Sequence, residues 1–198
     1  MSAGPAPLLS PTDPLPTHDR VLVCGVTGIG KSTLCRAVSR MWDLPYTELD
    51  SLYHGPGWTR RDTFTADVER VAASERWVSE LQYLGDGAGY LLADRGQLLL
   101  WLDYPRRIAR ARLWRRTLRR RLDGAEIWPQ TGNREGPLWR ALVDENHLLR
   151  WEGRTHAKWR ERYIPELRRS HPDLAVVRFG HPRELEAWLS ARADATPR

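Results

Sequence analysis

The chain has 198 residues, 41% of them apolar, and contains only two cysteines, Cys24 and Cys35. This length allows one sizeable core, so we expect a single domain over residues 20–192, and the cysteine usage excludes a disulfide framework. No apolar run in the sequence is long enough to span a membrane, and we expect a cytoplasmic protein. The net charge of +6 leaves a nucleic acid partner open.

The first predicted segment, residues 1–19, contains five prolines and lacks a charged start followed by an apolar run. This composition favours a disordered leader over a signal peptide. Residues 193–198 are interpreted as a short tail.

The strongest pattern is the stretch from Gly25 to Thr33, which fits the phosphate-binding loop pattern of glycine, four residues, then glycine-lysine-serine/threonine. A β-branched run over residues 20–24 predicts a strand before it, and apolar residues at helical spacing over residues 32–42 predict a helix after it. The motif therefore has the strand-loop-helix context that it requires. The predicted nucleotide-binding residues are Gly25, Thr27, Gly28, Ile29, Gly30, Lys31, Ser32 and Thr33.

Residue types in this loop match the chemistry of a nucleoside triphosphate. Glycines permit the backbone angles that turn successive N–H groups toward an anion, and the helix N-terminus adds the positive end of its dipole. The Lys31 ammonium is expected to reach the β- and γ-phosphates as a catalytic group, and the Ser32 hydroxyl to ligate magnesium. The expected cofactors are ATP and Mg²⁺.

A second strand is predicted over residues 45–49, ending at Asp50. Ligands of open α/β sheets lie beyond the carboxyl ends of the strands, so Asp50 is interpreted as a catalytic, acceptor-orienting carboxylate or a magnesium-shell ligand. An aspartate in a turn or helix cap is the alternative. Arg60 and Arg61, before a helix predicted over residues 62–74, are candidate clamps for an anionic acceptor, although solvated arginines explain them equally well.

Three more strands are predicted over residues 77–81, 97–102 and 173–179, with a closing helix over residues 183–193. Glu80 lies near the end of the first of these strands.

An arginine-rich helix is predicted over residues 105–122, with an apolar stripe formed by Ile108, Ala111, Leu118 and Leu122. Its arginines are interpreted as part of a lid over about residues 105–136, where they would stabilise charge developing on a transferring phosphoryl group. The alternative is a solvated basic face. The catalytic candidates are Arg112, Arg115, Arg116 and Arg119.

The order of these motifs resembles that of a known family. The residues that support this resemblance are those of the loop, Leu49-Asp50, Pro56-Gly57-Trp58, Trp77-Val78, the run from Trp101 to Arg106, the arginine-rich helix, and Asn133-Arg134-Glu135. The chain resembles the bacterial adenylate-kinase-related P-loop proteins labelled DNA topology modulation proteins, within the wider nucleoside monophosphate kinase and shikimate or gluconate kinase group.

This resemblance implies a three-layer α/β/α fold around a five-stranded parallel sheet of order 2-3-1-4-5, with a helical arginine-rich lid. It places ATP and magnesium at the loop, and the acceptor between the lid and about residues 50–75. One departure is visible: where the family typically has Trp-Val-Ile-Asp-Gly-Asn-Tyr, this chain has Glu80 at the aspartate and Leu81 at the glycine. The resemblance implies that Glu80 replaces the family aspartate, as a candidate for substrate binding and for the outer shell of the magnesium ion.

The leading hypothesis is an ATP- and magnesium-dependent phosphotransferase, similar to nucleoside monophosphate kinases, that acts on a small hydroxyl or phosphate acceptor. The alternative is a nucleotide-dependent nucleic-acid-binding protein or regulatory ATPase. The basic segment supplies charge for such binding, but aromatic residues are not regularly interleaved with it.

Overall fold

The computed structural model describes residues 4–16, 18–123, 126–128, 131–133 and 155–193. Helices and strands alternate along most of this chain, as the sequence predicts. Their bounds are β1 (Leu8–Leu9), β2 (Arg20–Cys24), α1 (Lys31–Trp42), β3 (Tyr46–Thr47), α2 (Leu49–Tyr53), η1 (Pro56–Trp58), α3 (Phe64–Ala73), β4 (Trp77–Glu80), η2 (Leu84–Asp86), α4 (Ala88–Ala93), β5 (Leu98–Leu102), α5 (Arg106–Asp123), η3 (Trp159–Tyr163), α8 (Ile164–Ser170), β6 (Ala175–Phe179) and α9 (Pro182–Ala193).

Within the described residues, the strands form one parallel sheet in the order β1-β6-β5-β2-β4-β3. The central strand β2 pairs with both β4 and β5, so that Val21 lies opposite Val78 on one side and Leu98 on the other. All five residues of β5 are buried. Continuous apolar strands of this kind are expected where helices cover both faces of a parallel sheet.

The sheet has six strands, and the prediction of five is wrong. The additional strand β1 pairs in parallel with β6 through Leu8 opposite Val176. The Ala6 N–H donates to the carbonyl of Arg168 at 2.7 Å, and Arg168 Nε donates to the carbonyl of Ala6 at 2.8 Å. The interpretation of residues 1–19 as a disordered leader is therefore wrong for the part that contains β1. Prolines favour an extended chain here, and the edge of β6 offers unpaired backbone groups to it.

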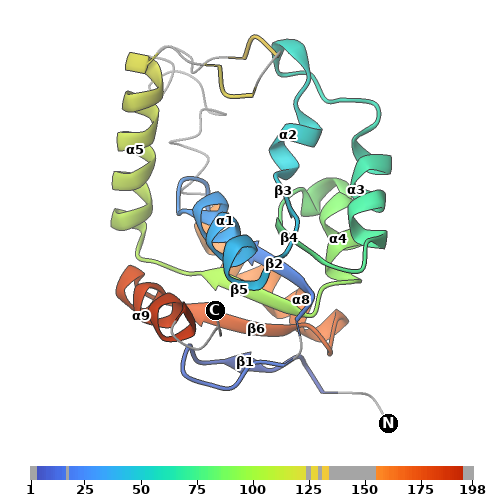
Figure 1. Ribbon diagram of the computed structural model, residues 1–198, viewed down its shortest axis with the longest axis vertical. Helices are drawn as coiled ribbons and strands as arrows, with labels where there is room; N and C mark the ends of the chain where they lie inside the picture. The colour runs from blue at the N-terminus through green and yellow to red at the C-terminus, as the bar shows by residue number, and fades with distance from the viewer. Residues whose placement is uncertain (1–3, 17, 124–125, 129–130, 134–154, 194–198) are drawn as a thin grey trace.

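Helices lie on both sides of the sheet, with α1 in front of the central strands and α8 behind them (Figure 1). The ring centroids of Trp42 at the end of α1 and Trp188 in α9 are 5.7 Å apart, which joins these two helices. In the other layer, the Tyr90 hydroxyl of α4 donates to Glu166 of α8 at 2.7 Å. The parallel α/β class is confirmed. None of the described helices is both long and apolar enough to cross a bilayer.

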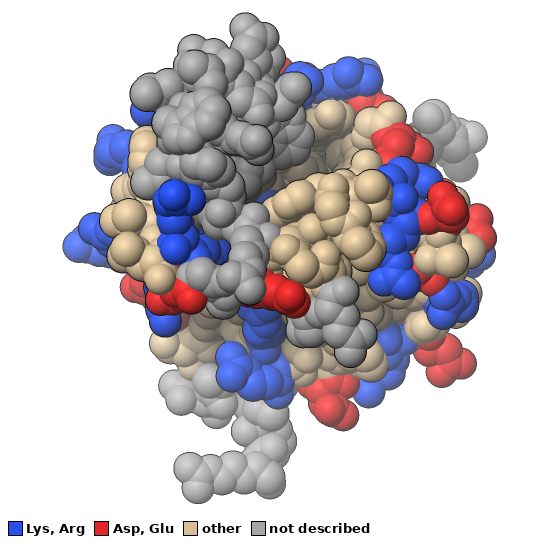
Figure 2. Space-filling view, turned by 90° about the horizontal axis from the view of Figure 1, so that it is seen from above, with Lys and Arg blue, Asp and Glu red and all other residues tan. Residues whose placement is uncertain are grey.

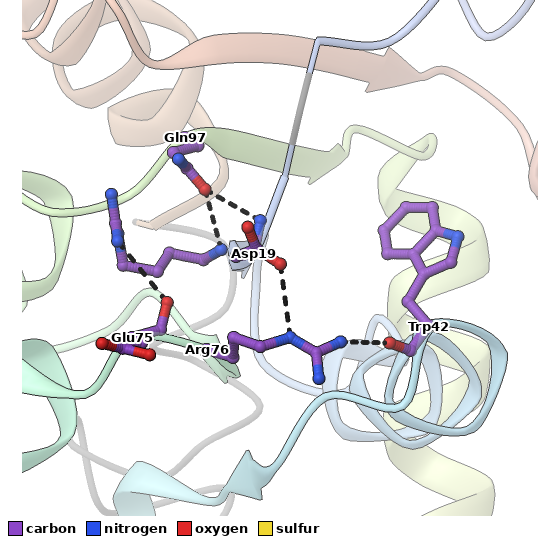
Figure 3. A network of polar contacts seen from close by, with 6 residues as sticks. Asp19, Trp42, Glu75, Arg76 and Gln97 are labelled. Carbon is purple, nitrogen blue, oxygen red and sulfur yellow. Dashed lines mark hydrogen bonds and ion pairs between the residues drawn. The ribbon is translucent and has the colours of Figure 1, made fainter.

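A polar network joins the amino ends of three strands to α1 (Figure 3). Gln97 Oε1 accepts hydrogen bonds from the backbone N–H groups of Asp19 and Arg20, at 2.8 and 3.1 Å. Arg76 lies 3.3 Å from Asp19 Oδ1 and donates to the carbonyl of Trp42 at 3.0 Å. This network holds β2, β4 and β5 in register at the end of the sheet opposite the phosphate-binding loop.

The second predicted strand is shorter than expected. Strand β3 ends at Thr47, and the chain turns into α2 because Ser51 donates its N–H and its hydroxyl to the carbonyl of Glu48, at 3.1 and 2.6 Å. Asp50 consequently lies in the first turn of a helix and not at a strand end.

Candidate active site

The loop between β2 and α1 has the backbone conformation of an anion cradle. Gly25, Gly28 and Gly30 have φ angles of +140°, +77° and +115°, which only glycine adopts without strain. At Gly25 a Cβ atom would lie 2.7 Å from the carbonyl oxygen of Leu102. All nine residues from Gly25 to Thr33, including the predicted nucleotide-binding residues, line a cleft of about 1040 Å³. The loop ends at the N-terminus of α1, where the helix dipole favours anions.

The Lys31 side chain folds back onto the backbone of the loop. Lys31 Nζ donates to the carbonyl of Val26 at 3.3 Å. Burial lowers the pKa of Lys31, and the nearby carboxylates of Asp50 and Glu80 oppose this effect. The next residue, Ser32, also lines the cleft. The ammonium and the hydroxyl are thus both available to a phosphate group in the cradle.

Three arginines of α5 line the same cleft: Arg112, Arg116 and Arg120, at four-residue intervals on one helix face. Arg112 Nη1 donates to the carbonyl of Ile29 in the loop at 2.8 Å. Among the four sequence candidates, the structure places Arg112 and Arg116 at the cleft. Arg120 was missed, although its spacing from Arg116 is a signal that the sequence already contains.

The other two candidates, Arg115 and Arg119, are exposed and do not belong to the cleft lining. The Arg119 guanidinium forms an ion pair with Asp123 at 3.6 Å. They lie on the outer side of α5 because a helix turns successive side chains by about 100°.

The predicted apolar stripe of α5 is wrong for Ala111, Leu118 and Leu122, which are exposed, whereas Ile108 is partly buried against the core. The buried residues are Ala109, Leu113 and Thr117, whereas the predicted Leu118 and Leu122 are 49% and 77% exposed. The reason is that the inner face of α5 packs against the loop: a Cβ at Gly28 would lie 2.8 Å from Cβ of Leu113.

Asp50 lines the cleft, and Tyr83 fixes the orientation of its carboxylate. The Tyr83 hydroxyl donates to Asp50 Oδ1 at 2.6 Å. Burial and the adjacent Asp50 charge raise the pKa of Tyr83, so the phenol remains a donor. Within the described part of the chain, no hydrogen-bond partner is found for the second oxygen, Asp50 Oδ2.

Glu80 is 1% exposed and does not belong to the cleft lining. It accepts a hydrogen bond from the Tyr46 hydroxyl at Oε1, at 2.7 Å, while its buried Oε2 has no partner in the described chain. The predicted substrate contact is therefore not direct. The neighbouring Leu81, at the position where the family typically has glycine, is fully buried and lines the cleft.

The two candidate anion clamps lie elsewhere. Neither Arg60 nor Arg61 lines the cleft. Arg60 Nη2 donates to Thr65 Oγ1 at 3.0 Å, and its guanidinium lies 5.3 Å from the centre of the Phe64 ring. These contacts occupy Arg60 on the surface of α3.

Residues 126–128 and 131–133 contact the chain that follows Asp50, a connection that no local sequence pattern indicates. Asn133, 2% exposed, donates from Nδ2 to the carbonyl of Gly55 at 2.9 Å and accepts from the N–H of Trp58 at 3.1 Å. The Trp128 ring stacks on the ring of His54, with centroids 4.9 Å apart. The short polar segment after α5 thereby contacts the chain that follows Asp50.

Another part of the lining comes from η3, α9 and the turn after β5, and it is largely apolar or aromatic. Its residues include Tyr104, Trp159, Tyr163, Pro182, Leu185 and Leu189. Asp103 anchors this part of the chain. Its buried carboxylate accepts hydrogen bonds from Arg160 at 2.6 Å and from Arg178 at 2.8 Å.

The structure shows no protein-only metal centre: the described residues contain no group of three or more histidine, cysteine, aspartate or glutamate side chains that could hold an ion. Cys24 and Cys35 are both buried, free thiols.

Comparison with known proteins finds similarity to solved structures only, because no family model and no curated protein matches the chain. A gluconokinase from Sinorhizobium meliloti 1021 is 20% identical, covering 90% of this chain and 97% of the other, with a TM-score of 0.48. A shikimate kinase from Bacteroides thetaiotaomicron is 16% identical, covering 90% and 98%, with a TM-score of 0.49. A sugar kinase from Janibacter sp. HTCC2649 is 18% identical, covering 92% and 100%, with a TM-score of 0.46.

At this level of identity the similarity concerns the course of the chain alone. The narrower resemblance to the DNA topology modulation type stays a prediction.

Proposed function

We propose that the protein is an ATP- and magnesium-dependent phosphotransferase that moves the γ-phosphoryl group of ATP to a small acceptor. One observation carries this proposal: the phosphate-binding loop with Lys31, the arginine face of α5 and the Asp50 carboxylate all line a single cleft. A cradle for anions, cations to stabilise charge and an acceptor-side carboxylate are the parts that phosphoryl transfer needs.

Two positive groups that line the cleft belong to different elements: Lys31 lies at the start of α1 and Arg116 in α5. They would therefore approach the phosphates of a bound nucleotide from different elements. Such fixed charges stabilise the negative charge of the transferring group without reorganising during the reaction. Arg112 donates a hydrogen bond to the carbonyl of Ile29 and so holds α5 against the loop.

The residues present fit a magnesium ion carried by the nucleotide. Ser32 lines the cleft beside Lys31, and its hydroxyl would be a ligand of the ion. When bound, Mg²⁺ would neutralise part of the phosphate charge. The apolar lining from η3 and α9 suits the base of the nucleotide.

On the acceptor side, Asp50 Oδ2 is placed to accept the proton of a hydroxyl group, because Tyr83 occupies Oδ1. Arg60 and Arg61 lie outside the cleft and offer no clamp for a phosphate acceptor. The arrangement therefore favours a hydroxyl acceptor over a nucleoside monophosphate.

The test is ADP release by the purified protein with Mg-ATP, alone and with a panel of hydroxyl and phosphate acceptors. Lys31→Ala is expected to abolish release. Lys158, the one other lysine of the sequence, is exposed and outside the cleft, so Lys158→Ala is the matched control. Equal activity in wild type and Lys31→Ala would refute the proposal.

Nucleic acid binding is a second candidate, favoured by the outer side of α5. Arg115 and Arg119 are exposed there beside Trp114, which is 44% exposed. Electrostatic binding of this kind weakens steeply with salt. Absence of oligonucleotide retention on filters at low salt would remove this candidate.

A further inference from the structure

The part of the cleft around Asp50 is built mainly from rings and aliphatic side chains. Its lining residues are His54, Trp58, Leu81, Tyr83, Leu84, Ile127 and Trp128. Three of these rings contact one another: the His54 centroid lies 4.9 Å from that of Trp128 and 5.3 Å from that of Trp58, and the two tryptophans are 5.7 Å apart. We call His54, Trp58 and Trp128 the aromatic wall.

The aromatic wall is held in place before any ligand binds. Its members come from two segments far apart in sequence, and buried Asn133 joins them through the carbonyl of Gly55 and the N–H of Trp58. Trp58 nevertheless remains 46% exposed, so its ring is accessible to a ligand. A preorganised aromatic surface binds flat rings at a low cost in conformational entropy.

Two carboxylates and one paired arginine line the cleft together with the aromatic wall. Glu48 and Asp50 both line the cleft, and Arg36 forms an ion pair with Glu48 at 3.4 Å. Burial lowers the pKa of His54, which favours the neutral ring near pH 7. The other described cations of the cleft come from the phosphate-binding loop and from α5.

Seen from above, the molecule shows an uncharged patch to the right of its centre, with basic and acidic side chains on several sides of it (Figure 2). An acidic group stacked on the aromatic wall would lie near the Asp50 carboxylate, and Arg36 is already paired with Glu48, so the loss of hydration would be only partly compensated.

We propose that the acceptor is an uncharged alcohol bearing a flat ring, which stacks on the aromatic wall and directs its hydroxyl to Asp50. This inference rests on the proposed phosphotransferase function and narrows its substrate class. The hydroxyl oxygen forms a bond to the γ-phosphorus, the bond to the β,γ-bridging oxygen breaks, ADP leaves with that electron pair, and the hydroxyl proton passes to the Asp50 carboxylate.

Matched pairs of acceptors test the charge requirement. The probes are 4-methylbenzyl alcohol against 4-(hydroxymethyl)benzoate, and uridine against uridine 5′-monophosphate. Binding is measured by titration calorimetry with a non-hydrolysable ATP analogue and magnesium, and transfer with γ-labelled ATP. We expect the neutral member of at least one pair to bind roughly tenfold more tightly than its anionic partner, a difference of about 1.4 kcal/mol.

Variants test the stacking surface. Trp128→Leu is expected to weaken binding of the neutral probe roughly tenfold, and Trp128→Phe to retain most of it, because a ring is kept. Trp114→Leu, on the exposed side of α5, is the matched control and should leave binding unchanged.

Preference for the anionic probes, or an equal effect of Trp128→Leu and Trp114→Leu, would overturn the inference. Failure of every ring-bearing probe to bind would overturn it as well. A different result would refute the proposed function itself, namely unchanged ADP release in Lys31→Ala. Transfer to anionic acceptors that depends on Lys31 would leave the function standing and refute only the substrate class.

Discussion

Replacement of Gly28 by alanine tests the contact between the phosphate-binding loop and α5. Gly28 has a φ angle of +77°, and a Cβ there would lie 2.8 Å from Cβ and 3.0 Å from Cα of Leu113. Gly28→Ala therefore adds two separate costs, one from backbone strain and one from steric overlap with the helix.

The two costs can be estimated and separated. A left-handed conformation costs an alanine about 1–2 kcal/mol. Overlap with well-packed neighbours adds about 1–3 kcal/mol, because carbon atoms prefer separations of about 3.5–4.0 Å. We expect Gly28→Ala to lower the free energy of unfolding by about 2–5 kcal/mol. Gly87 has a φ angle of +87° but no atom within 4 Å of its built Cβ, so Gly87→Ala reports the backbone cost alone.

The assay is urea unfolding of both variants followed by circular dichroism, together with titration of ATP. Gly28→Ala should be the less stable variant and should bind ATP more weakly, because the loop or α5 must move. Equal stability of the two variants would show that α5 does not pack against the loop as described.

Three further predictions follow from individual contacts. Arg116→Ala should lower kcat by about 10²–10³-fold, whereas the outward-facing Arg115→Ala should change it less than about threefold in steady-state assays. Deletion of residues 1–9 removes β1 and its backbone hydrogen bonds to β6 and Arg168, so calorimetry should show a loss of about 2–3 kcal/mol; unchanged stability would contradict the pairing. Burial lowers the pKa of His54 from 6.5, so the unfolded chain binds its proton first as pH falls; stability should decrease below about pH 6.5, and less so in His54→Gln.

Local sequence patterns predicted which segments form helices and strands better than they predicted which side of each helix is buried. The strand-loop-helix around Lys31 was predictable because backbone geometry and phosphate chemistry both require that spacing of residues. The buried side of α5 could not be predicted in this way. Its sequence carries apolar residues on two sides, and only the contact of Leu113 with the loop decides which side is buried, leaving Leu118 and Leu122 exposed.

The roles of scattered polar residues also depended on the fold. Asp50 was singled out from its place in the chain, but its partner Tyr83 lies 33 residues away, and no local pattern joins the two. Arg60 was an equally reasonable candidate until the structure placed its guanidinium against the Phe64 ring and outside the cleft.

The sequence alone thus determined the parallel α/β class and the strand-loop-helix around Lys31, because hydrophobic periodicity and glycine conformations act over a few neighbouring residues. The tertiary structure decided which arginines line the cleft, that residues before β2 add a sixth strand, and that His54, Trp58 and Trp128 meet beside Asp50. These outcomes depend on contacts between segments far apart in the chain, where many pairings satisfy the local pattern and only the packed whole selects one.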